Sequence, residues 1–508
     1  MNETSSASPP LSLAGAMAQG QHKRFVALPL AGQAAFARVT PLLRGALLLG
    51  VGGGFLLATI LTISAALRVN TGVWWEALAQ AHGYLQLYGW AGLFVLGVAL
   101  HFLPRLRGTP LVMPHLLPWI AGSLIASCLL RGFCQPLIAV SDAGVWRMGL
   151  IASGVLECVA IGLGLTSGVL TFTHGPSLAQ RPALVKVLPF IAIAFGSLGL
   201  AAVLNGANLL AVSHVSFGLV TEPGDTLNVT LGIFGFLIPI ALAMSVVALP
   251  MYAGLQAISA RFVSSVAGIY LVGLFVYLMG IFSGATPTLF STLCTGLGWL
   301  GIGGAMLTCV SVFLRMIRTR GSMPVHLMRL SPTPERMHYA YHAQIAAHRA
   351  VYGPFVPIIV SAYLWATLAA VLLLINGVAL LTTGIDVVAI DAVRHSLTIG
   401  FITLLLCGIA PRMLTAFAGK NIASPKLVTA TLWLGNSAAA LRVGAVLLPL
   451  STSGATLLQQ VAFGLSGPLG LAVALCLAIN LWPVLAVSTT KTQAGIPPGL
   501  THETQRSN

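Results

Sequence analysis

Long apolar runs, separated by short polar interruptions, fill most of this 508-residue chain. A membrane-spanning helix needs about 20 apolar residues, so the runs predict an all-α polytopic membrane protein. Strands are not expected at this depth, because unpaired backbone groups are costly in hydrocarbon. Twelve helices are predicted, at about 45–68, 81–104, 113–133, 147–173, 184–211, 226–253, 262–285, 288–315, 353–376, 391–416, 424–450 and 456–488.

A twenty-residue pattern recurs in the second, sixth and tenth predicted helices. Its copies, Gly89–Gly108, Gly235–Gly254 and Gly400–Gly419, align without gaps, and each begins with a glycine followed by an aromatic residue. Copies four helices apart indicate three four-helix units related by pseudo-threefold rotation about the membrane normal. Helices 2, 6 and 10 are then equivalent, and we expect them to face a shared interior. The units cover about 45–173, 184–315 and 353–488.

Composition supports a bilayer protein rather than a soluble one. The chain is 57% hydrophobic and 7% charged, whereas soluble domains are roughly 25% charged. Its seven cysteines form no CxxC pair, so neither a zinc site nor a disulfide framework is indicated. The bilayer is therefore the first expected partner.

The basic residues predict the orientation in the membrane. With the N-terminus inside, 20 of the 25 Lys and Arg residues fall on the inner side, which is a strong positive-inside signal. The net charge of +15 thus reflects topology and does not indicate nucleic-acid binding. We expect a cytoplasmic tail at 1–44, a membrane domain at 45–488 with a cytoplasmic loop at 316–350, and a cytoplasmic tail at 489–508.

Two of the twelve histidines stand out by position. His82 begins helix 2 and His395 begins helix 10, so on parallel helices both lie near the outer boundary at similar depth. An ionisable residue at membrane depth is a functional hypothesis by default. Two neutral imidazoles on adjacent helices can bind a haem iron from both faces. Ordinary interfacial histidines and a proton relay are the alternatives.

Arginines on the same side are candidates for binding haem propionates. Arg394 adjoins His395, and Arg131, Arg147 and Arg442 are expected on the same side of the membrane. A guanidinium pairs with a carboxylate through two hydrogen bonds. The alternative is ordinary pairing of these helix-end arginines with Asp142 or Asp391.

Three further residues are weaker candidates. His101 lies 19 residues beyond His82, about 28 Å along a helix, so the two cannot share one metal. His101 is therefore interpreted as interfacial, with a second metal site as the minority alternative. His214 is a third candidate ligand or proton carrier. Glu157, the one acid deep in a predicted span, is expected to be hydrogen-bonded and protonated or to belong to a proton path.

The helix 2 and helix 10 segments resemble the NnrS family. The matching stretches are His82-Gly-Tyr-Leu-Gln-Leu-Tyr-Gly-Trp and His101-Phe-Leu-Pro-Arg in helix 2, and Arg394-His395-Ser-Leu-Thr-Ile-Gly-Phe and Pro411-Arg412-Met-Leu in helix 10. These bacterial proteins are haem- and copper-associated, span the membrane twelve times and are linked to tolerance of nitric oxide and nitrosative stress. The family is similar to subunit I of the haem–copper oxidases, in which three arcs of four helices place ligands on helices 2, 6 and 10.

The resemblance implies a bacterial inner-membrane protein with b-type haem between His82 and His395, and nitric oxide or another small diatomic as ligand. It departs from the oxidase pattern in its copper ligands, because predicted helices 6 and 7 contain no histidine. Copper is thus left open with its usual ligands absent, and no catalytic residue is assigned. A cofactor-free secondary transporter built on the same repeats and a nitric oxide reductase-like enzyme with a second metal remain the alternatives.

Overall fold

The computed structural model describes residues 30–69, 72–141, 143–212, 216–253, 258–283, 288–319, 346–447 and 453–486. All regular structure in these ranges is helical. The predictions for residues 1–29, for most of the loop 316–350, for the tail from 487 and for His214 fall outside the described residues.

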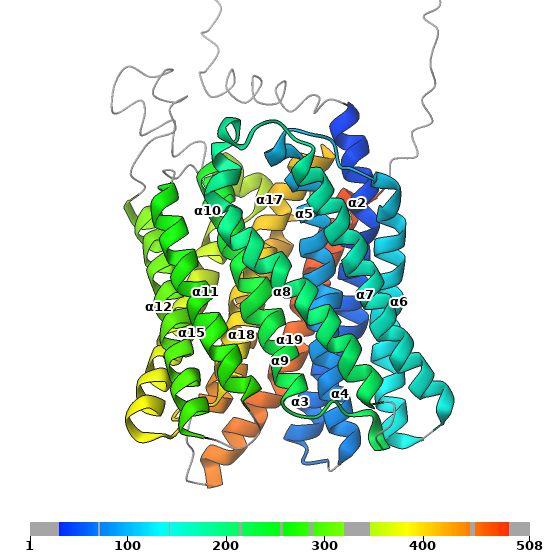
Figure 1. The fold of residues 1–508 in the computed structure, drawn as a ribbon, viewed down its shortest axis with the longest axis vertical. Coiled ribbons are helices and arrows are strands. Elements are labelled where there is room, and N and C mark those ends of the chain that lie inside the picture. Colours follow the sequence, from blue (N-terminus) through cyan, green and yellow to red (C-terminus); the bar gives the residue numbers. More distant parts are fainter. Residues whose placement is uncertain are drawn as a thin grey trace, which may run out of the picture.

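Along the chain, the described long helices fall into three consecutive groups of four, and Figure 1 shows them packed side by side in one bundle. Among the described residues, four helices (the first, second, sixth and tenth) carry an internal π-helical segment, labelled η, that joins two α-helical parts. The first group comprises α2 (Leu30–Leu49), η1 (Gly50–Phe55) and α3 (Leu56–Ala66); α4 (Val73–Tyr84), η2 (Leu85–Gly92) and α5 (Leu93–Arg107); α6 (Leu117–Val140); and α7 (Gly144–Thr173). The second comprises α8 (Pro182–Val212); α9 (Gly224–Thr230), η6 (Leu231–Leu237) and α10 (Ile238–Ala253); α11 (Ala260–Phe282); and α12 (Leu289–Thr319). The third comprises α15 (Phe355–Thr383); α16 (Ile390–His395), η7 (Ser396–Thr403) and α17 (Leu404–Ala418); α18 (Pro425–Leu447); and α19 (Ser453–Leu485).

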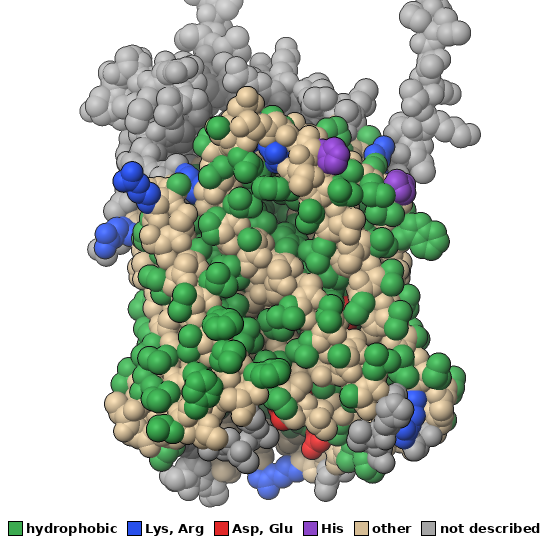
Figure 2. Space-filling model, viewed as in Figure 1, with side chains coloured by type: hydrophobic (Ala, Val, Ile, Leu, Met, Phe, Trp, Pro, Cys, Tyr) green, Lys and Arg blue, Asp and Glu red, His purple; other side chains and the backbone are tan. Residues whose placement is uncertain are grey.

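Within the described residues, eleven helices are long and apolar enough to cross a membrane. The remaining long helix, α18, packs against α19 but carries Lys426, Asn436 and Arg442, which lower its hydropathy. The all-helical, multi-span architecture is therefore confirmed, while the count of twelve spans stays a prediction. In Figure 2, apolar side chains cover the middle of the visible face and charged side chains gather towards its two ends.

The first helix begins earlier than predicted. Residues 30–44, which we expected in a tail, form most of α2. Phe36, Leu42 and Leu43 are almost fully buried in the core, because α2 packs along α5. Helix 2 likewise begins at Val73 rather than near residue 81. Packing against neighbouring helices extends both elements beyond their most apolar stretch.

Helices 2, 6 and 10 form the inner layer of the bundle. In their most apolar windows 78%, 89% and 72% of residues are buried, whereas the other eight candidate spans range from 33% to 50%. The three repeat-bearing helices are thus surrounded by protein, and the others present one face to lipid. This arrangement agrees with the shared interior expected from the repeats.

The π-helical segments of the inner helices share one register. η2, η6 and η7 begin at Leu85, Leu231 and Ser396, each four residues before the first glycine of its repeat copy. π-helical turns are rare and occur frequently at functional sites. Their equivalent placement extends the sequence repeat to a repeat of local backbone geometry.

Candidate functional site

His82 lies in the last turn of α4, three residues before η2 begins at Leu85. Its Nδ1 is 2.8 Å from the carbonyl oxygen of Gly54 in the π-helical segment η1 of the first helix. A Cβ at Gly54 would lie 3.0 Å from the side chain of Gln86. A glycine there therefore lets the first helix approach helix 2 closely enough to accept the histidine hydrogen bond.

His395 ends α16 and directly precedes η7. Its Nδ1 is 3.0 Å from the backbone carbonyl oxygen of Asp391 and 3.0 Å from the carboxylate Oδ1 of the same residue. The other carboxylate oxygen, Oδ2, is 2.8 Å from Nη2 of Arg442 on α18. Arg442 in turn lies over the ring of Phe463, 4.5 Å from its centroid. A carboxylate and a guanidinium thus orient this imidazole.

The two imidazoles share one hydrogen-bonding arrangement. In each, Nδ1 faces an acceptor, which favours the tautomer that carries its proton on Nδ1. Nε2 then holds a lone pair, and no hydrogen bond from the described residues engages it in either ring. His82 is also within electrostatic range of His395, Asp391 and Arg442. Histidines that bind metals donate their second ring N–H to a carbonyl or carboxylate in this way.

Arg131 and Arg394, the predicted propionate partners, group around a different acid. Both are within electrostatic range of Asp225, which lies at the start of α9. Arg131 is only 2% exposed, and its guanidinium lies 5.3 Å from the centre of the Tyr84 ring. Among the described residues its Nε and Nη1 have no hydrogen-bond partner. The arginine linked to the histidine pair is Arg442, another of the arginines that the sequence predicts on this side.

Glu157 anchors a buried polar cluster behind helix 2. Its Oε2 accepts hydrogen bonds from the Tyr84 hydroxyl at 3.0 Å and from the Asn205 amide. The Tyr84 hydroxyl is also 2.7 Å from the Ser127 hydroxyl. Tyr84 is two residues from His82, which places the two side chains on nearly opposite sides of the helix. The Glu157 cluster is therefore separate from the histidine pair.

His101 is held by packing in the C-terminal part of helix 2. It is buried, and its ring lies between those of Phe36 and Phe417, at centroid distances of 5.1 and 4.6 Å. Its Nε2 contacts Nη1 of Arg105. Engagement of Nε2 does not favour His101 as a metal ligand. In the part of the chain that the structure describes, no three or more His, Cys, Asp or Glu residues lie close enough together to hold a metal ion.

Comparison with known proteins reveals a likeness in fold. No protein-family profile matches the sequence, and no curated protein sequence matches it. Among solved structures, the fold is similar to a chain of a haem–copper terminal oxidase dimer, with a TM-score of 0.61, 14% identity, and coverage of 91% of this chain and 85% of that chain. At this identity the likeness shows the fold alone. The protein is thus a polytopic helical membrane protein with a haem–copper oxidase-like fold.

Proposed function

We propose that this chain is a haem-binding protein of the bacterial inner membrane, with b-type haem held between His82 and His395, that acts in the response to nitrosative stress. The observation that carries the proposal is the matched pair of imidazoles. Each has Nδ1 bonded to an acceptor and Nε2 free of partners among the described residues. They lie on two of the three inner helices of an oxidase-like fold.

The donor set fits an iron porphyrin better than an isolated metal ion. Two neutral nitrogen ligands are too few for a closed metal site, whereas a macrocycle brings four nitrogens of its own and needs only axial ligands. When bound, haem supplies a one-electron redox couple and an iron that can bind diatomic gases. Arg442, whose Nη1 has no hydrogen-bond partner among the described residues, is a cationic group near this pair that a propionate carboxylate would satisfy.

The two histidines are not held alike, and this difference has a chemical consequence. His82 donates to a neutral carbonyl, while His395 faces a carboxylate that Arg442 orients. A carboxylate partner raises the basicity of an imidazole ligand. If haem is bound, His395 would be the more basic of the two ligands and His82 would be the more weakly held one.

The resemblance of helices 2 and 10 to the NnrS family supports the role in nitric oxide tolerance. The sequence of α9, η6, α10 and α11 contains no histidine, so an oxidase-type copper site has no ligands there. Binding or sensing of nitric oxide at a single haem is therefore favoured over its reduction at two metals. Orientation with both termini in the cytoplasm is part of the same proposal and follows from the distribution of basic residues.

The test is a reduced-minus-oxidised visible spectrum of the purified full-length protein. We expect haem bands in the parent and their loss or marked shift in His82→Ala and in His395→Ala. His101→Ala is the matched control, because that histidine also lies on helix 2 but its Nε2 contacts Arg105. Addition of nitric oxide to the reduced parent should shift the Soret band. A colourless parent that takes up no added haem would overturn the proposal and favour a cofactor-free transporter.

A further inference from the structure

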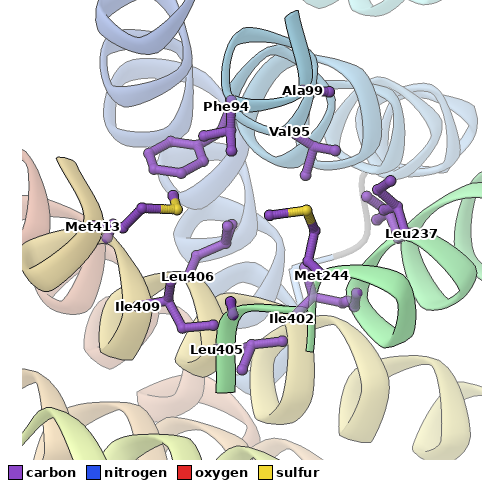
Figure 3. Close-up of a pocket in the computed structure, with 15 residues that line it drawn as sticks. Phe94, Val95, Ala99, Leu237, Met244, Ile402, Leu405, Leu406, Ile409 and Met413 are labelled. Atoms are coloured by element: carbon purple, nitrogen blue, oxygen red, sulfur yellow. The ribbon is translucent and has the colours of Figure 1, made fainter. Parts of the chain in front are cut away.

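A cavity of about 70 Å³ lies between the inner helices. Its walls come from helix 2 (α5), helix 6 (η6 and α10) and helix 10 (η7 and α17), and Figure 3 shows side chains from all three converging on it. It begins beyond the π-helical segment of helix 2, whereas His82 lies before that segment. Phe94, at its rim, is twelve residues from His82, about 18 Å along the helix. The cavity is therefore distinct from the histidine pair.

The cavity lies on the pseudo-threefold axis of the molecule. Counted from the first glycine of each repeat copy, the fifth following residue lines it in all three copies, as Phe94, Ile240 and Leu405. The sixth residue does so as well.

The ninth residue after the first glycine also lines the cavity in all three copies, as Val98, Met244 and Ile409. Three equivalent helical faces meeting at one point would leave such a space at their centre. The repeat, rather than a local packing accident, accounts for its position.

The lining determines what the cavity can hold. All of its lining residues are apolar, and a water molecule needs two to four polar partners to remain in a cavity. A lining of this kind favours small apolar solutes such as xenon over water. The thioethers of Met244 and Met413 point towards one another across the space (Figure 3), and their sulfur atoms are polarisable and adaptable.

We propose that this axial cavity is a binding site for small uncharged apolar molecules, of the size of xenon or a diatomic gas. Such molecules concentrate in the bilayer, and the site lies among helices that cross it. The size of the cavity limits the ligand to small molecules, because about 70 Å³ is only several times the ~10–15 Å³ of accessible space that one water molecule needs. This proposal does not require bound haem. Its test measures a bound-xenon signal, whereas the haem proposal is tested by visible absorption bands.

Variants that fill the cavity can be chosen by copying a larger residue from the equivalent position of another repeat copy. At the sixth position, Ala241 of helix 6 corresponds to Val95 and Leu406. Ala241→Leu copies the larger side chain of helix 10 and should fill the cavity. Ala248→Met copies Met413 at the thirteenth position and is a second filling variant, in case the first does not fold.

The experiment is ¹²⁹Xe NMR of the purified full-length protein in detergent, titrated with xenon. We expect a saturable bound-xenon shift in the parent, its loss in both filling variants, and its retention in Ala207→Leu, the same substitution at a lipid-exposed position of α8. The filling variants should also unfold at the same or a higher temperature than the parent. Equal xenon shifts in the parent and the folded filling variants would overturn the proposal. Density for a lipid or detergent chain in the cavity would also overturn it.

Discussion

At the scale of single residues, the site depends on which partner holds each imidazole. Asp391 is four residues before His395, one helical turn away, and contacts it through both its backbone and its carboxylate. Arg442 from α18 holds the second carboxylate oxygen. This chain of contacts predicts that the electronic properties of the bound haem depend on Asp391.

Replacing Asp391 with Asn should raise the haem reduction potential, because the negative charge that favours the oxidised iron is lost. The expected shift is on the order of 60 mV, since the partners of ligating histidines typically change affinity by ten-fold or more and ten-fold corresponds to 59 mV for one electron. A potentiometric titration of the visible bands measures it. Asp386→Asn, which removes the same charge from the exposed loop before α16, should move the potential much less. Equal shifts would show a bulk charge effect and no specific role for Asp391.

At the scale of secondary-structure elements, the π-helical segments set how closely the first two helices approach. A Cβ at Gly50 would lie 2.2 Å from Cε3 of Trp90, and Trp90 donates to the Thr403 hydroxyl of η7 at 3.4 Å. Helices 1, 2 and 10 are thus linked through one indole at the level of the π-helical segments. The geometry that brings Gly54 to His82 depends on this contact.

Gly50→Ala should therefore separate η1 from η2 and destabilise the protein by about 1–3 kcal/mol, as overpacking does in a filled core. Thermal unfolding of the purified protein measures the loss, and haem occupancy should fall with it. Gly52→Ala is the matched control two residues along the same segment, because its Cβ would meet no atom within 4 Å. Adding Trp90→Leu to Gly50→Ala should restore part of the stability. If Gly50→Ala and Gly52→Ala unfold alike, the close approach has no energetic importance.

At the scale of the whole molecule, the sequence predicts the architecture better than the site. Apolar runs and the repeated glycines foretell the inner position of helices 2, 6 and 10, because both follow from burial and from the spacing along the chain. The early start of α2 was not predictable from hydropathy, since Arg38, Pro41 and Arg44 interrupt that stretch. Tertiary packing of Phe36 and Leu43 overrides the interruption.

In the candidate site, too, some residues were predictable from the sequence and others were not. His82 and His395 were recognisable as imidazoles at membrane depth. Their partners were less so, because Gly54 contributes only a backbone carbonyl and Arg442 arrives from a helix 47 residues beyond His395. The pattern of arginines at the outer boundary named Arg442 together with Arg131, Arg147 and Arg394, since sequence alone does not show which side of a helix each one faces. The spacing of Asp391 and His395 was the one local signal available.

The most direct test of the account is a cryo-EM map of the haem-loaded full-length protein. The account predicts planar density between helices 2 and 10, with the iron bonded to Nε2 of His82 on one face and to Nε2 of His395 on the other. Density for Arg442 should reach a propionate. A map of fully loaded protein in which the macrocycle lies elsewhere, or in which either imidazole points away from the iron, would contradict it.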